Sequence, residues 1–169
     1  NTLTPFDGVF RYSKLTGLID GTDSSILSNI TTLKIRKDFT PTLASSTKYN
    51  VYFRNALFNP HSGHNAAAGG ILETSGFKIS GDSSTVFFLD DDGQGNVRRY
   101  SFSGATRVYA NETQGTIDYS TGAITINSLS VLSVENIRGE ASTKIELTVV
   151  PQSNDIVPVR DQVLEIDIA

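Results

Sequence analysis

Alternation of apolar and polar residues most constrains how this chain of 169 residues folds. It recurs in four separate runs, whose apolar positions are Leu33, Ile35 and Phe39; Tyr49, Val51 and Phe53; Ile145, Leu147 and Val149; and Leu164, Ile166 and Ile168. A period of two residues buries one face of a β-strand and leaves the other in water. Val86–Leu89 is instead a continuous apolar run, which predicts a strand covered on both faces. We therefore expect a mostly β (β-rich α+β) fold with antiparallel sheets or a sandwich, long loops and at most short helices.

Two β-hairpins are predicted, one around the polar run Asp90–Asn96 and one around Ser120-Thr121-Gly122. The segments that flank these turns are Thr85–Leu89 with Val97–Phe102, and Gly115–Tyr119 with Ala123–Ile126. Gly122 can adopt the left-handed conformation that a short hairpin loop requires. Helix-forming patterns are weak: Asp23–Asn29 could form one turn capped by Asp23, and a short helix could begin near Pro158.

The segment His61–Gly70 has little bulk and no apolar periodicity, so it predicts an exposed, mobile loop. We expect an N-terminal β lobe over residues 1–60 and a main antiparallel β domain over residues 71–169; a single domain also fits the pattern. The chain opens at Asn1, contains no methionine and ends just after the strand-like residues 162–168. We therefore expect it to be a piece of a longer protein.

Composition argues against several classes of function. The net charge is −4 and the sequence pI is near 5.1, whereas nucleic-acid-binding domains are basic. The densest basic spot, formed by Lys34, Arg36 and Lys37, is interpreted as a solvated strand face. The absence of cysteine excludes disulfides, Cys-ligated zinc and thiol nucleophiles. No apolar run approaches the roughly 20 residues that span a bilayer. We expect neither nucleic acid nor a membrane among its partners.

The acidic turn carries the sharpest chemical hypothesis. Asp90, Asp92, Gln94 and Asn96 occupy alternating positions, as the ligands of a calcium loop do, but Ser101 stands where such a loop has its bidentate glutamate. We interpret the run as a structural hairpin turn and keep a weak calcium site as the alternative.

Other chemistry is less supported. His61 and His64 form a His-x-x-His pair, but the nearest carboxylate is Glu73 and a stable metal site needs a third and a fourth ligand. The sequence has no Gly-x-Ser-x-Gly elbow and no phosphate-binding glycine loop. We therefore expect no catalytic residue, no cofactor and no enzyme activity.

Three segments resemble the baseplate wedge proteins of T4-like myophages. They are Ser13–Leu33, which contains Ser13-Lys14-Leu15, Ile19-Asp20 and Thr31-Thr32-Leu33; the hairpin Gly115–Ile124; and Pro151–Leu164, which contains Asn154-Asp155-Ile156. The subunit in question forms the continuous ring of the inner baseplate, and this chain resembles part of its C-terminal half.

The resemblance implies a structural subunit of the virion, made in the host cytoplasm and without catalytic residues. It implies a homo-oligomer, with a dimer within the ring, that assembles with other wedge proteins around the hub. Phe6, Phe10 and Tyr12 are the interface residues we predict, with packing in the core as the alternative.

Two rival functions remain. The first is a carbohydrate-binding β module of a tail fibre or adhesin, which could use calcium at Asp90–Asn96; it predicts aromatic side chains clustered on loops at one end. The second is a virion glycan hydrolase or esterase, which predicts a cleft with two acids or a nucleophile beside His61 or His64.

Overall fold

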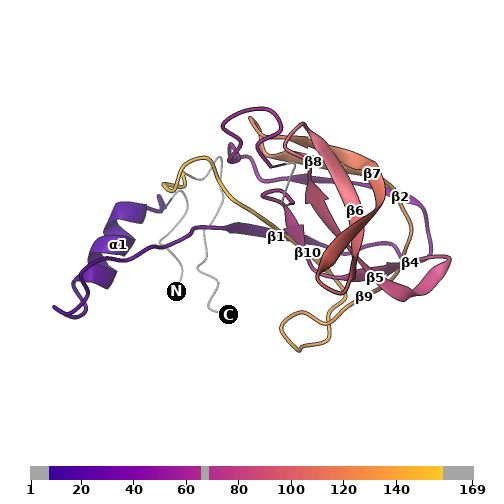
Figure 1. Ribbon diagram of the computed structural model, residues 1–169, viewed down its shortest axis with the longest axis horizontal. Helices are drawn as coiled ribbons and strands as arrows, with labels where there is room; N and C mark the ends of the chain where they lie inside the picture. Colours follow the sequence, from indigo (N-terminus) through magenta and orange to yellow (C-terminus); the bar gives the residue numbers. More distant parts are fainter. Residues whose placement is uncertain (1–7, 66–68, 158–169) are drawn as a thin grey trace. The chain divides into compact units, whose positions relative to one another are not determined.

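The computed structural model describes residues 8–65 and 69–157 (Figure 1). The chain divides into two compact units, the β unit of residues 34–152 and the helical unit of residues 1–33 and 153–169. The described strands all lie in the β unit and the described helix lies in the helical unit. Each unit is treated by itself below.

In the described residues, the β unit contains ten strands, and neighbouring strands pair antiparallel. They are β1 (Ile35–Phe39), β2 (Thr47–Tyr52), β3 (Glu73–Thr74), β4 (Phe77–Ile79), β5 (Asp82–Asp91), β6 (Asn96–Ser103), β7 (Thr106–Asp118), β8 (Ala123–Leu129), β9 (Val131–Val134) and β10 (Ile145–Val149). One sheet has the order β1-β10-β3 and the other the order β2-β8-β7-β6-β5-β4-β9. The predicted mostly β, antiparallel fold is confirmed.

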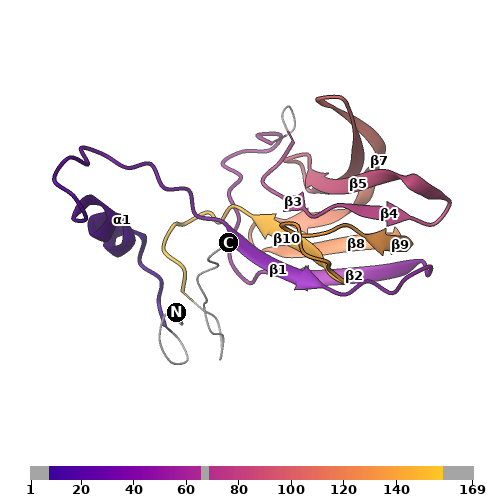
Figure 2. The same cartoon turned by 90° about the horizontal axis from the view of Figure 1, so that it is seen from below.

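The larger sheet curls into a half-barrel (Figure 2). The sheet curls because one continuous segment of the chain supplies a strand near each end of the strand order. β8 lies between β2 and β7, and after the single residue Ser130 the chain continues as β9, which pairs with β4 at the other end of the strand order. Strands before residue 61 pair with strands after residue 70, since β1 pairs with β10 and β2 with β8. The β unit thus joins the two segments on either side of His61–Gly70.

The core lies between the two sheets. Each contributes fully buried aliphatic side chains: Leu89, Ile124, Ile126 and Leu129 from the larger sheet, and Ile145, Leu147 and Val149 from the smaller one. Burial alternates residue by residue along β1 and β10, as the period-two pattern predicts. In the apolar run Val86–Leu89, Phe87 and Leu89 are buried, while the alternate residues Val86 and Phe88 are half-buried, so both faces of β5 are covered.

Both predicted hairpins are present. β5 pairs with β6 from Phe87 opposite Ser101 to Asp91 opposite Val97. β7 and β8 flank the second turn, in which Gly122 has φ 69° and a Cβ atom would lie 2.4 Å from the carbonyl oxygen of Asn55. Only glycine meets both demands at that position.

The helical unit corrects the prediction of a helical turn over Asp23–Asn29. The described helix is α1 (Tyr12–Asp20), whereas Asp23 accepts a hydrogen bond from the Ser25 N–H in a turn. α1 has no cap from its preceding side chain; the Asp155 carboxylate accepts the Tyr12 N–H at 2.8 Å instead. Local sequence cannot reveal a cap supplied from so distant a residue. With nine residues, α1 is far shorter than the roughly 20 residues that a membrane-spanning helix needs.

Two further sequence predictions, a helix starting near Pro158 and the strand pattern of Leu164, Ile166 and Ile168, lie outside the described residues.

Candidate functional site at the Asp90–Asn96 turn

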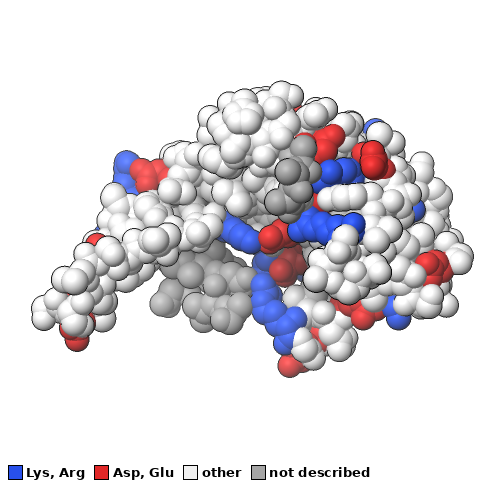
Figure 3. Space-filling model, viewed as in Figure 1, with Lys and Arg blue, Asp and Glu red and all other residues white. Residues whose placement is uncertain are grey.

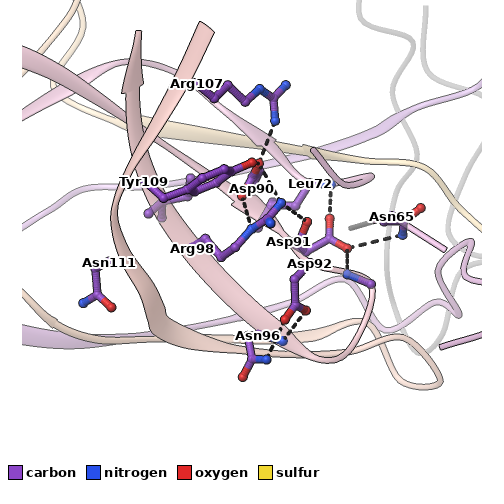
Figure 4. Close-up of polar contacts among 12 residues, drawn as sticks. Asn65, Leu72, Asp90, Asp91, Asp92, Asn96, Arg98, Arg107, Tyr109 and Asn111 are labelled. Carbon is purple, nitrogen blue, oxygen red and sulfur yellow. Dashed lines mark hydrogen bonds and ion pairs between the residues drawn. The ribbon is translucent and has the colours of Figure 1, made fainter. Parts of the chain in front are cut away.

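Asp90 and Asp91 end β5 and Asp92 follows directly, and the three carboxylates point to three different environments (Figure 4). The side chain of Asp90 is 1% exposed and lies opposite Arg98 on β6. Its Oδ1 accepts the Arg98 Nε–H at 2.9 Å, and its Oδ2 accepts Arg98 Nη2 at 3.1 Å. The same Oδ2 accepts Arg107 Nη1 at 2.6 Å and the Tyr109 hydroxyl at 2.9 Å. One buried carboxylate therefore joins β5, β6 and β7.

The two guanidinium groups of this cluster also lie against aromatic rings. Cζ of Arg98 is 4.2 Å from the centre of the Tyr109 ring, and Cζ of Arg107 is 4.6 Å from that of Tyr100. Burial, and after it the hydrogen bond to Asp90, raises the pKa of Tyr109. The phenol therefore keeps its proton and serves as a donor to Asp90.

Asp91 is fully buried, and its carboxylate is held by neutral donors. It accepts the Leu72 N–H at 2.9 Å, the Tyr119 hydroxyl at 2.6 Å and, at 3.3 Å each, the Asn65 amide and the Gly93 N–H. Burial, followed by the hydrogen bond to Asp91, raises the pKa of Tyr119 strongly. Asp91 therefore links the end of β5 to the segment that precedes β3 and to the residue that follows β7.

Two glycines permit this close packing. A Cβ atom at Gly70 would lie 1.6 Å from Asp91 Oδ1, and one at Gly69 would lie 1.6 Å from Arg107 Nη1. Gly69 also has φ 78°, in the left-handed region. In the predicted exposed loop His61–Gly70, then, Asn65 is buried and the two last glycines contact the charged cluster.

Asp92 closes the turn itself. Its Oδ1 accepts the N–H groups of Gln94 at 2.8 Å and Asn96 at 2.9 Å, and its Oδ2 accepts the Asn96 amide at 2.6 Å. Partial burial disfavours the charged form, but the hydrogen bonds from Asn96 and Gln94 outweigh it and lower the pKa of Asp92. These contacts are those of a structural turn.

The residues of the calcium hypothesis are not brought together as a ligand set. Asp90 is directed at Arg98 and Arg107, and the Asn96 amide donates to Asp92. Across residues 8–65 and 69–157, no three His, Asp or Glu side chains are grouped to hold a metal ion. A calcium ion at Asp90 would have to displace two guanidinium groups, so the calcium site stays a prediction against which the geometry argues.

The two histidines do come together. Nδ1 of His64 lies 3.2 Å from Nε2 of His61, and the His64 ring packs edge-on against Phe58. Both histidines are exposed, and the pair has no further ligand among the described residues.

The predicted interface residues have different surroundings. Phe6 lies outside the described residues. Phe10 is 8% exposed and forms a backbone bridge with Ile156, and the half-buried Tyr12 donates its hydroxyl to the Thr31 carbonyl at 2.7 Å. Whether either residue contacts a partner stays a prediction.

Sequence reasoning missed the most exposed large apolar side chains in the described part of the helical unit. Leu18, Leu27 and Ile30 are 65%, 95% and 99% exposed. Leu27 and Ile30 lie in the largely polar run from Thr22 to Thr32. This run has no apolar periodicity, and that is the signal that could have marked the two residues as exposed.

Comparison with known protein families gives a match at the N-terminal end of the chain. The family model described as baseplate structural protein gp6, C-terminal domain III, matches residues 1–38, of which residues 8–38 are described. No curated protein and no solved structure matches the chain. The matched segment includes α1, the exposed Leu27 and Ile30, and most of β1. The match supports a structural role in a phage baseplate.

Proposed function

We propose that this protein is a structural subunit of a contractile phage tail baseplate wedge. It acts in the virion by self-association and by assembly with other wedge proteins into the ring around the hub. The observation that carries the proposal is the baseplate match over residues 1–38, which falls on the segment that exposes Leu27 and Ile30.

The exposure of these side chains supports assembly. Burying one leucine or isoleucine side chain contributes about 1.5–3 kcal/mol. Leu27 and Ile30 contribute almost none of this to folding, because they are 95% and 99% exposed in the chain by itself. A partner that covers both would gain that free energy.

The charged cluster supports a role without catalysis. Asp90 and Asp91 are 1% and 0% exposed, and their oxygens are bonded to neighbouring side chains and backbone groups. A carboxylate so enclosed has no path to a substrate, and its contacts are those of a brace between strands.

The distribution of charge on the visible face does not suit a nucleic-acid partner. On the face shown in Figure 3, basic and acidic side chains are interspersed and do not gather by sign. Nucleic acid is recognised by contiguous basic surfaces.

Binding to purified wedge proteins of the same phage tests the proposal. The unmodified chain should bind them, and the double variant Leu27→Ser/Ile30→Ser should bind at least roughly tenfold more weakly, since a lost 1.4 kcal/mol is tenfold in affinity. Leu132→Ser is the matched control, because Leu132 is an apolar residue of β9 that is 38% exposed. Failure of the unmodified chain to bind any wedge protein would contradict the proposal.

A further inference from the structure

Strand β1 forms one edge of the three-stranded sheet (Figure 2). β10 occupies one side of it, and within the described part of the chain no strand pairs with the other side. Alternate residues of an edge strand direct their N–H and C=O groups away from the sheet, ready to pair with another strand. The sequence of β1 is Ile35-Arg36-Lys37-Asp38-Phe39, with its charged and apolar positions arranged symmetrically about Lys37.

We propose that β1 pairs antiparallel with β1 of a second copy of this chain, with the two-fold axis at Lys37. This inference rests on the proposed self-association and names the surface that carries it. In this register Arg36 faces Asp38 of the second copy, and Ile35 faces Phe39 of the second copy. Because the axis relates the copies, each contact occurs twice.

The outward face of the joined sheet acquires two pairs of opposite charge across the joint. Within one chain, Asp38 pairs with Lys144 at 3.0 Å and Arg36 pairs with Glu146 at 2.7 Å. Both of these ion pairs run diagonally, because in register Asp38 lies opposite Glu146 and Arg36 lies opposite Thr148. Across the joint, Asp38 would lie directly opposite Arg36 of the second copy, so each of the two would gain a further partner of opposite charge. Opposite charges directly across neighbouring strands stabilise a sheet, and like charges destabilise it.

The inward face of the joined sheet acquires an apolar row. Ile35 and Phe39 are half-buried and pack against the core, and they lie opposite Val149 and Ile145 of β10. Pairing would place Phe39 beside Ile35 of the second copy and remove more of both side chains from water. The core of each copy would then continue into that of the other.

Lys37 is the one position at which like charges meet. An edge lysine usually discourages strand pairing. Here the ammonium group of Lys37 donates to the Tyr52 carbonyl at 2.6 Å, on the face toward β2. Burial, followed by repulsion from Arg54, lowers the pKa of Lys37. The charge is thus turned away from the joint, and Lys37 weakens the pairing without preventing it.

Charge reversal tests the register, with sedimentation equilibrium of the full chain as the measurement. Arg36→Asp places two aspartates across the joint and Asp38→Arg places two arginines there, so each variant should self-associate roughly tenfold more weakly. A mixture of these two variants should recover association, because the aspartate introduced into one chain then faces the arginine introduced into the other. Lys48→Asp, at an exposed position of β2, is the control with the same change of charge as Arg36→Asp.

Mixing separates the interface from damage to the fold, since two destabilised chains cannot repair each other unless the altered residues meet. If both variants still self-associate as the unmodified chain does, and mixing them does not change the strength of association, the β1 pairing is wrong. The proposed function would still stand. A chain that stays monomeric at all concentrations would also overturn the pairing, and the proposed function would then depend on the experiment with wedge proteins.

Discussion

Asp90 and Arg98 form a bidentate ion pair between β5 and β6, with Oδ1 of Asp90 2.9 Å from Nε of Arg98 and Oδ2 3.1 Å from Nη2. The Asp90 side chain is 1% exposed and the Arg98 side chain 10%. Because Arg107 and Tyr109 approach the same carboxylate from β7, the pair sets how three consecutive strands lie against one another. The cluster stabilises the fold, and the surfaces proposed for assembly lie elsewhere, on β1 and in the helical unit.

Removing the buried carboxylate should destabilise the protein strongly. We expect Asp90→Ala to lower the free energy of unfolding by about 3–5 kcal/mol, because Arg98 and Arg107 would be left without their counter-charge. Urea unfolding followed by circular dichroism measures the loss. Glu73→Ala, which removes a half-exposed partner of Lys34, should cost at most about 1 kcal/mol. Equal losses in the two variants would show that Asp90 is not a structural brace.

A methyl group at Gly70 should also destabilise the protein, since its Cβ would lie 1.6 Å from Asp91 Oδ1. The expected cost of Gly70→Ala is about 1–3 kcal/mol, the range for forced overpacking. Gly17→Ala is the control: Gly17 lies in α1 with nothing within 4 Å of a Cβ, and alanine should stabilise that helix by up to about 1 kcal/mol. An unchanged thermal midpoint for Gly70→Ala would refute the close packing.

The turn after β7 should make stability depend on pH in the acid range. Hydrogen bonds from the hydroxyls of Ser120 and Thr121 and from the Ser120 N–H lower the pKa of Asp118 from 3.8 to about 2. A carboxyl group with a lowered folded-state pKa stabilises the fold above its unfolded-state pKa, and the contribution is lost as pH falls through the folded-state value.

We therefore expect Asp118→Asn to be less stable than the unmodified protein at neutral pH, with the difference shrinking between about pH 4 and pH 2. Thermal midpoints across this range measure it. Ser120→Ala should reduce the same dependence, because it removes one of the donors. A difference that stays constant down to pH 2 would show that Asp118 is not held in this way.

Calcium should not bind at the Asp90–Asn96 turn. Asp90 is neutralised by two guanidinium groups, and Asp92 is bonded to Gln94 and Asn96. Titration calorimetry with millimolar Ca²⁺ is expected to give no binding heat. Saturable binding that is lost in Asp92→Asn would instead restore the calcium site.

Much of the β architecture could be predicted from the sequence because strand alternation and hairpin turns are local. Strand β10 could be predicted from the alternation of Ile145, Leu147 and Val149. The second hairpin could be predicted from the glycine of its Ser120–Gly122 turn. Helix α1 could not be predicted in the same way, since its first N–H is capped by Asp155, which lies 143 positions further along the chain.

The charged cluster was out of reach of sequence reasoning for a related reason. The acidic turn was identified, but its chemistry depends on which side chains of β6 and β7 face it. The pairing of β6 with β7 shifts register between Val97 and Arg99 and again between Arg99 and Tyr100. Such bulges change which side chains face a strand and leave no reliable mark in the sequence. The alternation of Asp90 and Asp92 therefore predicted a possible calcium loop, whereas in the structure Asp90 accepts two guanidinium groups and Asp92 closes the turn.

Sedimentation velocity of the unmodified chain, alone and mixed with purified wedge proteins of its phage, tests the central claim most directly. The proposed assembly role predicts a concentration-dependent dimer of the chain alone and a larger complex in the mixture. A chain that stays monomeric, binds no wedge protein and binds sugars would contradict the proposed assembly role.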